Sequence, residues 1–440
     1  MASFAARSKG FVWENHPIFE AMGVRLIGLL GALLCAQNVL FWDLYLHDDP
    51  QRDTVHLWSF AHLTDVHIGE GEGDYGTPGY IDTLTGYEEG YAVRRLREAL
   101  TYLKQNWTAH KLAFIAVTGD LTDSGERSEY LRFQAIMDSV GLPYIAFIGN
   151  HDVWPYVNAS NEAPWAYGDS LAVVWLNSMY SRFQNLVDAW QSGPSLFQSV
   201  WNPERNHPSR FHNFYFDFRG VRFVAVDGVT RQPAPFGQAG VGPAADIHDF
   251  PGGTIRFLDT LLSQPQPYPL VFLCHYPLID NPLSGANSFS PQEYERIVNL
   301  LYPQRSKVRL WLAGHIHRTA DYPLRHPSSG TLFARCVESP ANKEQDGGQF
   351  RIVRIWGDAL SSGLLEGLTD SPFEIEVWGS HLRVKGRGWL TLYTALGQEI
   401  AQKALSGAWE IRLRPGVYYV RFADEVGRLQ GKRLLITAEE

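Results

Sequence analysis

Short apolar runs alternate with amphipathic stretches over most of the chain. Residues 58–64, 112–117, 144–147, 270–274 and 308–313 are almost wholly apolar and predict buried strands. Between them, apolar residues recur every three or four positions, which predicts helices with one buried face. The predicted helices cover residues 93–104, 126–140, 254–263 and 292–301. This alternation of strands and helices predicts an α/β domain.

Two further segments of this domain have distinct patterns. Residues 214–218 and 221–226 flank Arg219-Gly220 and predict a β-hairpin. Residues 154–212 are irregular and aromatic, with helical turns expected at 171–189. This insertion could form a wall of a substrate pocket, or a separate hydrophobic cluster under a long loop. Apolar runs at 332–337 and 350–356 predict the last strands of the domain.

The C-terminal part of the chain alternates at the two-residue period of a half-buried strand. Strands are predicted at residues 373–378, 389–394, 409–413, 417–422 and 432–436. Gly-containing turns separate them, and a segment rich in Gly, Ser and acidic residues at 361–372 precedes them. We therefore expect residues 371–440 to form a small antiparallel β-sandwich domain.

The N-terminal segment follows a different pattern. Residues 26–36 are apolar and follow the basic residues Arg7, Lys9 and Arg25, and the apolar character continues to Trp42 before acidic residues begin. This order is typical of a secretory signal peptide or a single membrane anchor. A helix packed on the α/β domain is the alternative. We expect residues 1–50 to be a signal or anchor with a spacer, and the protein to be exported or membrane-anchored outside the cytoplasm.

Composition narrows the class of protein. The 440 residues are 45% hydrophobic and 19% charged, which fits two globular domains with a terminal extension. The net charge of −9 argues against nucleic acid as the main partner. Cys35, Cys274 and Cys336 lie in apolar runs, so buried free thiols are expected instead of a disulfide framework.

Polar side chains that bind metals follow five of the predicted strands. They are Asp65 and His67, then Asp120, then Asn150 with His151, then His275, and finally His315 with His317. Residues two apart in an extended segment point to the same side, so a pair such as Asp65 and His67 can hold one cation. Sites in open α/β sheets form at the carboxyl ends of the strands. The pattern therefore predicts one shared metal site.

The order of these blocks is that of a known family. Asp-x-His, Gly-Asp, Gly-Asn-His-Asp, His and Gly-His-x-His occur in sequence within residues 55–360, and in this the chain resembles the calcineurin-like metallophosphoesterases. The resemblance implies a four-layer α-β-β-α sandwich with two mixed sheets. We accordingly assign residues 54–360 to a metallophosphoesterase domain, followed by the C-terminal β-sandwich.

The resemblance also implies a role for each residue. One ion would be bound by Asp65, His67 and His317, and the other by Asn150, His275 and His315. Asp120 would bridge them, His151 would contact phosphate and protonate the leaving oxygen, and Asp152 would orient the ring of His151. The mixed N and O donors suit two divalent or trivalent ions of Mn, Fe, Zn or Co, without choosing among them.

Such a centre predicts hydrolysis of phosphate monoesters or diesters. Two cations can clamp a phosphoryl oxygen and acidify a bridging water, whose hydroxide attacks phosphorus in line with the leaving group. The expected substrate is a small-molecule or lipid-headgroup phosphate ester. The alternative is a non-catalytic, metal-bound scaffold that binds a partner, and the presence of His151 favours the enzyme.

Other residues refine this picture. Purple acid phosphatases need a Tyr three residues after the bridging Asp, where this chain has Asp123. His62 is expected to be a hydrogen-bonded core residue, and Asp227 could be either structural or a support of the site. The stretches beginning at Leu392 and Leu413 resemble a C-terminal sorting domain of type IX secretion, although a packing module would have the same pattern.

Overall fold

The computed structural model describes most of the two predicted domains. The described residues are 38–47, 54–70, 90–123, 125–153, 169–183, 186–190, 198–231, 244–279, 288–358, 374–378, 381–394, 399–414, 416–423 and 429–436. The predicted export segment before residue 38, residues 71–89 and the linker at 361–372 lie outside them.

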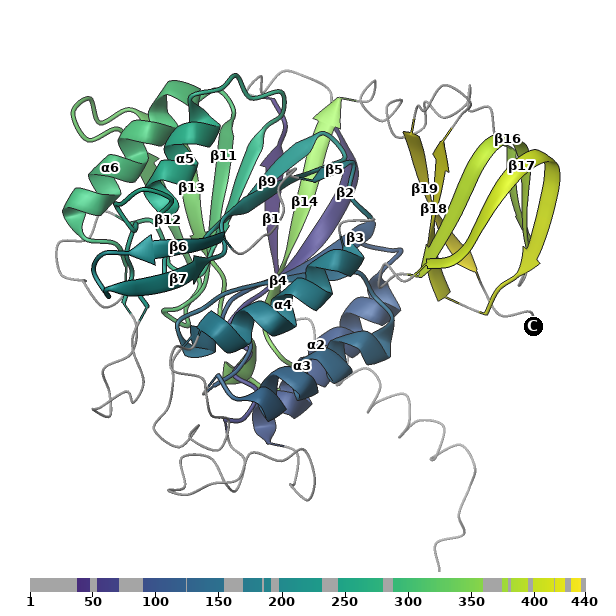
Figure 1. The fold of residues 1–440 in the computed structure, drawn as a ribbon, viewed down its shortest axis with the longest axis horizontal. Helices are drawn as coiled ribbons and strands as arrows, with labels where there is room; N and C mark the ends of the chain where they lie inside the picture. The colour runs from purple at the N-terminus through teal and green to yellow at the C-terminus, as the bar shows by residue number, and fades with distance from the viewer. Residues whose placement is uncertain are drawn as a thin grey trace, which may run out of the picture.

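Two mixed β-sheets lie at the centre of the larger domain, with helices on both outer sides (Figure 1). The helices are α2 (Tyr91–Asn106), α3 (Arg127–Val140), α4 (Asp169–Phe183), α5 (Thr254–Leu262) and α6 (Pro291–Leu301). In Figure 1, α2, α3 and α4 lie beside the first sheet, and α5 and α6 beside the second. The four-layer α/β arrangement expected from the sequence is confirmed.

In the described part of the chain, the first sheet has the order β1-β14-β2-β3-β4. Its strands are β1 (Val39–Tyr45), β14 (Phe350–Asp358), β2 (Thr54–Leu63), β3 (Leu112–Thr118) and β4 (Tyr144–Phe147). Strands β2, β3 and β4 are parallel, whereas β14 is antiparallel to β2. The carboxyl ends of β2, β3 and β4 therefore meet at one edge.

The second sheet has the order β12-β13-β11-β10-β9-β8-β5 among the described residues. Its strands are β12 (Ala320–Arg325), β13 (Leu332–Glu338), β11 (Val308–Ala313), β10 (Leu270–Cys274), β9 (Val221–Val226), β8 (Phe214–Phe218) and β5 (Ala189–Trp190). Strands β9, β10, β11 and β13 are parallel. The predicted hairpin is confirmed as β8 and β9, which are antiparallel.

Aromatic side chains from both sheets pack between them. Phe60 of β2 stacks on Phe114 of β3, with ring centroids 5.2 Å apart. Phe223 of β9 contacts both rings edge-on, at 5.3 and 5.4 Å. Such pairs contribute about 0.5–1.5 kcal/mol each beyond the burial of their area. This packing fixes the two sheets against each other and brings the loops after their strands together.

The helices begin and end where the sequence places signals. Helix α3 stops at Gly141, which adopts the left-handed conformation with φ of 68°. Helix α6 starts with a capping box, in which Ser290 accepts the Glu293 amide and the Glu293 carboxylate accepts the Ser290 amide. Short 3-10 turns complete the helical elements described: η1 (His151–Val153), η4 (Tyr302–Gln304) and η5 (Asn342–Glu344).

The described part of the aromatic insertion joins the main core. Helix α4 buries Leu176, Tyr180 and Phe183 in the same cluster as the sheets, so this helix is not part of a separate cluster. Beyond it, β6 (Gln198–Asn202) and β7 (His207–Phe211) form a small hairpin that leaves Trp201 exposed.

The start of the α/β domain differs from our prediction. The apolar run that we assigned to a signal or anchor includes Val39 to Trp42, yet these residues form β1, which pairs in parallel with β14. Val39 and Leu44 are buried in the main core. The sheet therefore begins at residue 39 and not near residue 54. Among the described residues, no helix is long and apolar enough to cross a membrane.

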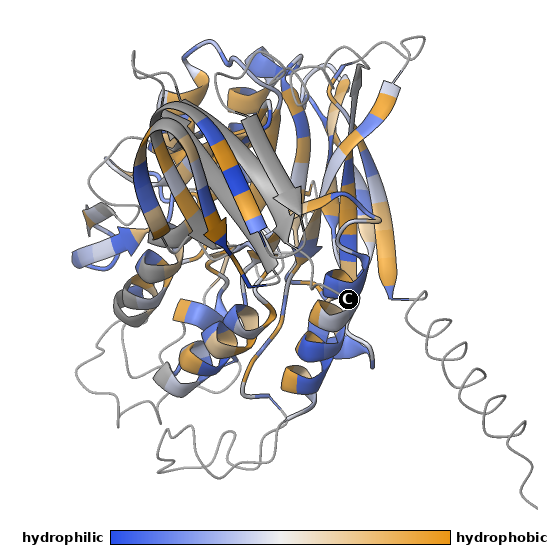
Figure 2. Ribbon diagram, turned by 90° about the vertical axis from the view of Figure 1, so that its right-hand side faces the viewer, coloured by the Kyte–Doolittle hydropathy of each residue, from blue (hydrophilic) through white to orange (hydrophobic). Residues whose placement is uncertain are grey.

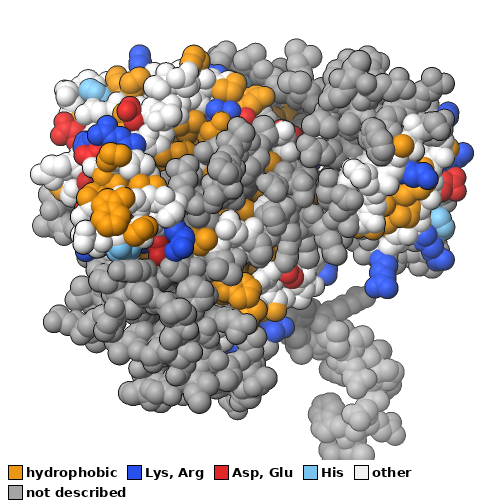
Figure 3. Space-filling model, in the orientation of Figure 1, with side chains coloured by type: hydrophobic (Ala, Val, Ile, Leu, Met, Phe, Trp, Pro, Cys, Tyr) orange, Lys and Arg blue, Asp and Glu red, His pale blue; other side chains and the backbone are white. Residues whose placement is uncertain are grey.

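The C-terminal strands form an antiparallel sheet, as predicted. They are β15 (Glu374–Trp378), β16 (His381–Thr394), β17 (Glu399–Arg412), β18 (Gly416–Ala423) and β19 (Leu429–Ile436). Strand β16 pairs with β17 along its length and with β15 and β18 at its two ends. Apolar and polar residues alternate along it, as Figure 2 shows, and leucines such as Leu382 and Leu390 form a cluster separate from the main core. Figure 3 shows basic side chains on the visible face of this sheet.

Candidate metal centre

The loops after β2, β3 and β4 carry the first half of the centre. The backbone N–H groups of Val66 and His67 both donate to the carbonyl of Asp120, at 2.8 and 2.9 Å. The N–H of His151 donates to Asp120 Oδ1 at 2.9 Å. These bonds tie three consecutive strand ends into one unit and place the polar side chains of the loops side by side.

The second sheet contributes His275 after β10 and His315 and His317 after β11. The N–H of Gly314 donates to the carbonyl of His275 at 3.0 Å, which joins these two loops. The N–H of His315 donates to Asp65 Oδ2 at 3.0 Å, which connects the second sheet to the first. The predicted ligands from both sheets therefore converge.

Most of the ligand-type residues have an unusual backbone. Asp65, His67, Asp120, His315 and His317 all have positive φ, between 49° and 75°. A residue with a side chain pays of order 1–2 kcal/mol for the left-handed conformation. Such strain persists where the surrounding structure fixes the backbone, and it is typical of functional sites.

Close packing between the loops after β3 and β4 explains the glycine of the Gly-Asn-His-Asp motif. A Cβ atom at position 149 would lie 2.2 Å from both the amide nitrogen and Oδ1 of Asp120. Only glycine can therefore occupy position 149 while the loop after β4 keeps its contact with the loop after β3.

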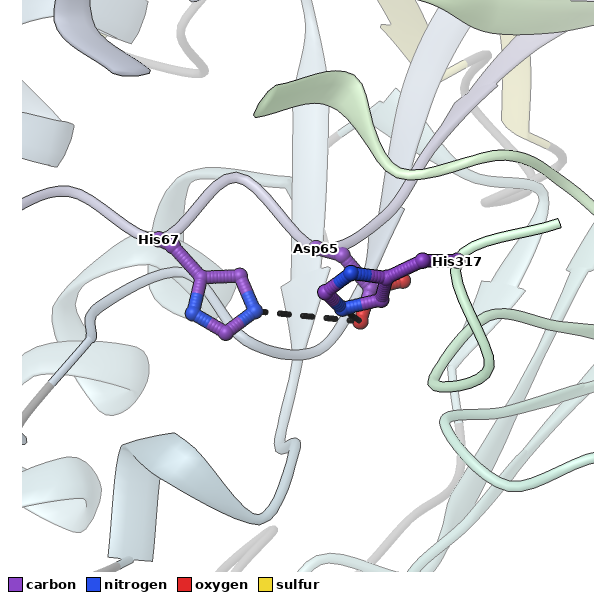
Figure 4. A group of neighbouring side chains, drawn as sticks. All are labelled: Asp65, His67 and His317. Atoms are coloured by element: carbon purple, nitrogen blue, oxygen red, sulfur yellow. Dashed lines mark ion pairs between the residues drawn. The ribbon is translucent and has the colours of Figure 1, made fainter. Parts of the chain in front are cut away.

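Asp65, His67 and His317 form the first group of donors. Asp65 Oδ1 lies 3.3 Å from His317 Nε2 and 4.0 Å from His67 Nε2. In Figure 4 the His67 ring lies to one side of Asp65, and the His317 ring overlaps the Asp65 carboxylate in this view. Asp65 and His67 are buried, whereas the His317 side chain is 28% exposed. The group is therefore closed on one side and open at His317.

Asn150, His275 and His315 form the second group. Asn150 Oδ1 lies 2.9 Å from His275 Nε2 and 3.0 Å from His315 Nδ1. Asp120 lies between the two groups, because its Oδ2 atom is 3.3 Å from His67 Nε2 and 3.2 Å from His275 Nε2. The structure thus brings all seven predicted metal ligands together.

The hydrogen bonds of the rings show that the residues fit cations. His275 Nδ1 lies 2.9 Å from the carbonyl oxygen of Thr118, which can only accept, so Nδ1 carries the hydrogen. In the neutral ring, Nε2 then directs its lone pair at oxygens of Asp120 and Asn150. Among the described residues, the buried Nε2 atom of His67 has no hydrogen-bond partner. Converging lone pairs of this kind require a positive charge between them.

The buried carboxylates of the centre stabilise positive charge between the two groups of ligands. Burial alone would lower the pKa of His67, but the adjacent carboxylates of Asp120 and Asp123 outweigh it and raise this pKa to about 10. Burial would also lower the pKa of His275, but Asp120 outweighs this effect and raises the pKa to about 9. Although burial would raise the pKa of Asp120, the nearby histidines hold it well below its usual value. Bound metal ions would replace these protons.

His151 lies at the edge of the centre. Its ring centroid is 4.5 Å from that of His67, and its side chain is 20% exposed. Nδ1 lies 2.6 Å from the carbonyl oxygen of Asp123, so this nitrogen donates its hydrogen and, in the neutral ring, the lone pair is on Nε2.

Asp152 has contacts that differ from those we predicted. Its Oδ1 atom accepts the backbone N–H groups of Leu121 and Thr122 at 3.0 Å, and Oδ2 accepts the N–H of Gly149 at 2.8 Å. The carboxylate therefore braces the loop after β3 against the loop after β4. The His151 ring is held by the backbone carbonyl of Asp123, and an orienting role for Asp152 stays a prediction.

Sequence reasoning missed two supporting carboxylates. Asp123 Oδ1 lies 2.7 Å from His67 Nδ1, and Glu344 Oε1 lies 2.9 Å from His317 Nδ1. Asp123 follows Asp120 by three residues, at the position where purple acid phosphatases have a tyrosine. No local pattern indicates Glu344, which reaches the centre from η5.

Two polar residues near the strands are structural. Both ring nitrogens of His62 are hydrogen-bonded at 2.7 Å, to Ser339 and Thr118, which confirms the expected core histidine. Asp227, for which we left two roles open, forms a buried ion pair with Arg231 and accepts the His212 N–H at 2.8 Å. It stabilises the loop after β9.

Comparison with known proteins supports the family suggested by the motifs. The family model for calcineurin-like phosphoesterases matches residues 59–319, which is more than half of the chain. No curated protein matches the chain.

Two of the solved structures that match the chain are distant in sequence. One is GAP50, the anchor in the inner membrane complex of Plasmodium, with 11% identity, 88% of this chain and 90% of that chain covered, and a TM-score of 0.35. The other is a putative 5′-nucleotidase from Staphylococcus aureus in complex with alpha-ketoglutarate, with 12% identity, coverage of 88% and 55%, and a TM-score of 0.32. The chain spans about half of the length of that nucleotidase.

Proposed function

Because the chain belongs to the calcineurin-like phosphoesterase family and is a phosphoesterase, we propose that it hydrolyses phosphate monoesters or diesters at the metal centre described above. Asp65, His67 and His317 would hold one cation, and Asn150, His275 and His315 the other. Asp120 would be shared between the two. When bound, two such ions neutralise phosphoryl charge and acidify the attacking water.

The position of His151 is the observation that carries the proposal. Its ring lies against His67, and its backbone N–H donates to the shared carboxylate of Asp120. The Asp123 carbonyl holds Nδ1–H, so Nε2 is the atom that exchanges a proton with the leaving oxygen. Burial lowers the pKa of this ring, and the negative charge of a bound phosphate would restore its proton.

The exposure of the ligands supports one direction of approach for the substrate. Asp65, His67, Asp120 and His275 are buried, whereas His151, His315 and His317 are partly exposed. A phosphate ester would therefore approach from the three exposed rings. The substrate we propose is a small-molecule or lipid-headgroup phosphate ester, and the metals are Mn, Fe, Zn or Co.

Turnover of p-nitrophenyl phosphate and bis-p-nitrophenyl phosphate with added Mn²⁺ tests the proposal. Asp120→Asn should abolish turnover on both substrates and reduce metal content, because it removes the shared carboxylate. His151→Ala should lower kcat by about 10²- to 10⁴-fold while metal content stays at the wild-type level. The matched control is His326→Ala, at a half-buried histidine outside the metal centre, whose Nδ1 lies 3.2 Å from Ser329 Oγ.

The leaving group provides a sharper test of the role of His151. A general acid matters most when the leaving oxygen is basic. The His151→Ala variant should therefore lose more activity on an alkyl phosphate than on p-nitrophenyl phosphate. Absence of metal-dependent turnover in the wild type on the whole panel would instead favour the non-catalytic scaffold.

A further inference from the structure

A separate group of metal-binding side chains lies outside the centre described above. It consists of Glu204, Asp246 and His248, each with a ligand atom within 4.8 Å of those of the other two. Glu204 lies in the turn between β6 and β7, whereas Asp246 and His248 precede α5. Two segments that are distant in the sequence therefore bring a nitrogen and two carboxylates together.

The His248 ring is fully buried, and its hydrogen bond fixes where its lone pair lies. Nε2 is 2.9 Å from the carbonyl oxygen of Val229. A carbonyl only accepts, so Nε2 carries the hydrogen, and in the neutral ring the lone pair is on Nδ1.

Nδ1 faces the acidic side of the group. Among the residues that the structure describes, this buried nitrogen has no hydrogen-bond partner. Oδ2 of Asp246 lies 3.6 Å from it, too far for a hydrogen bond. A lone pair that faces a carboxylate oxygen inside a protein is unfavourable unless a cation lies between them.

The backbone holds this arrangement in place. Oδ1 of Asp246 accepts the N–H of His248 at 2.7 Å, and Glu293 of α6 accepts the N–H of Ile247 at 3.0 Å. The N–H of Asp246 donates to the carbonyl of Gly228 at 2.9 Å. His248 itself has φ of 50°, the conformation shared by most ligands of the main centre. Oδ2 of Asp246 is thereby left to face the ring.

We propose that Glu204, Asp246 and His248 bind a single divalent transition-metal cation such as Zn²⁺ or Mn²⁺. One imidazole nitrogen with carboxylate oxygens is a donor set for these ions, whereas Ca²⁺ prefers oxygen alone. Glu204 is exposed, so water can complete the coordination. The ion would tie the β6–β7 turn to the loop before α5, which stabilises the folded state and is independent of turnover at the main centre.

Metal content of the full-length chain tests this assignment. The wild type, Glu204→Gln and Asp246→Asn are stripped with a chelator, dialysed against Zn²⁺ and analysed by mass spectrometry of the metal. Each variant should hold about one equivalent less than the wild type, because either substitution removes a ligand. Asp249→Asn is the matched control, since it removes a charge from the same loop, but this residue pairs with Arg296 instead.

Thermal unfolding gives a second readout that does not depend on activity. Added Zn²⁺ should raise the Tm of the wild type and of Asp249→Asn more than that of Glu204→Gln, in buffers where all three are folded. Glu204 is exposed, so this variant tests the site even if Asp246→Asn fails to fold.

Two results would overturn the assignment. The first is equal Zn²⁺ content in the wild type, Glu204→Gln and the control. The second is an equal Tm response in all three, as expected if a proton on His248 balances Asp246. Turnover of p-nitrophenyl phosphate by Glu204→Gln at the wild-type rate would show that any loss of metal comes from this site and not from the main centre.

Discussion

At the scale of single residues, hydrogen bonds decide which ring nitrogen of each histidine can bind a metal. Asp123 fixes Nδ1 of His67, and the carbonyl of Thr118 fixes Nδ1 of His275, so Nε2 of both rings faces Asp120. Partners of this kind orient the ligand and increase its basicity. The supporting residue is therefore as informative about the site as the ligand itself.

Asp123 and Glu344 make similar contacts in different surroundings, which allows a matched test. Asp123→Asn should weaken metal binding at the main centre by about 10- to 100-fold, because it removes a buried partner of His67. Glu344→Gln should change the affinity less than about threefold, because the Glu344 side chain is 47% exposed and water can replace it. Isothermal titration of the metal-free variants with Mn²⁺ measures both effects, and equal losses would contradict this ranking.

At the scale of elements, the edge of the first sheet depends on β1. This strand pairs with β14 along seven residues, from Val39 with Phe350 to Tyr45 with Trp356. Asp43 accepts both guanidinium hydrogen bonds of Arg354, at 2.6 and 2.8 Å. Without β1, the edge of β14 would be an exposed template for pairing with other chains.

Two truncations separate the contribution of β1 from that of the segment before it. A chain that starts at residue 38 retains β1, whereas a chain that starts at residue 48 lacks it. We expect the shorter chain to unfold at lower urea concentration and to aggregate more, because it loses the buried Val39 and Leu44 and exposes β14. Urea unfolding and light scattering compare the two, and identical midpoints would show that β1 contributes no stability.

At the scale of the whole molecule, the predicted metal ligands all lie in the α/β domain, whose hydrophobic core is separate from that of the C-terminal sheet. The predicted ligands all lie between Asp65 and His317, and the family match covers residues 59–319. The leucine cluster of the C-terminal sheet is distinct from the core beneath the metal centre. The resemblance of this sheet to a secretion sorting domain, and the predicted export of the chain, stay predictions.

Removal of residues 371–440 tests how independent the two parts are. Turnover of p-nitrophenyl phosphate and metal content should stay within about twofold of the full chain, because domains with their own cores fold separately. Steady-state kinetics and metal analysis of both chains measure this. A shorter chain that keeps its metal but has a much higher KM would show that the C-terminal sheet shapes the substrate site.

The sequence by itself determined the elements and the ligand types. Apolar periodicity placed strands such as β10 and β11 at their observed bounds, and each metal-binding block followed a strand, because burial and turn formation are local requirements. Only the tertiary structure decided the pairing of β1 with β14, the partners of the histidines and the convergence at His248. Those features depend on contacts between segments that are distant in the chain. A local pattern of apolar and polar residues does not indicate which distant segments come together.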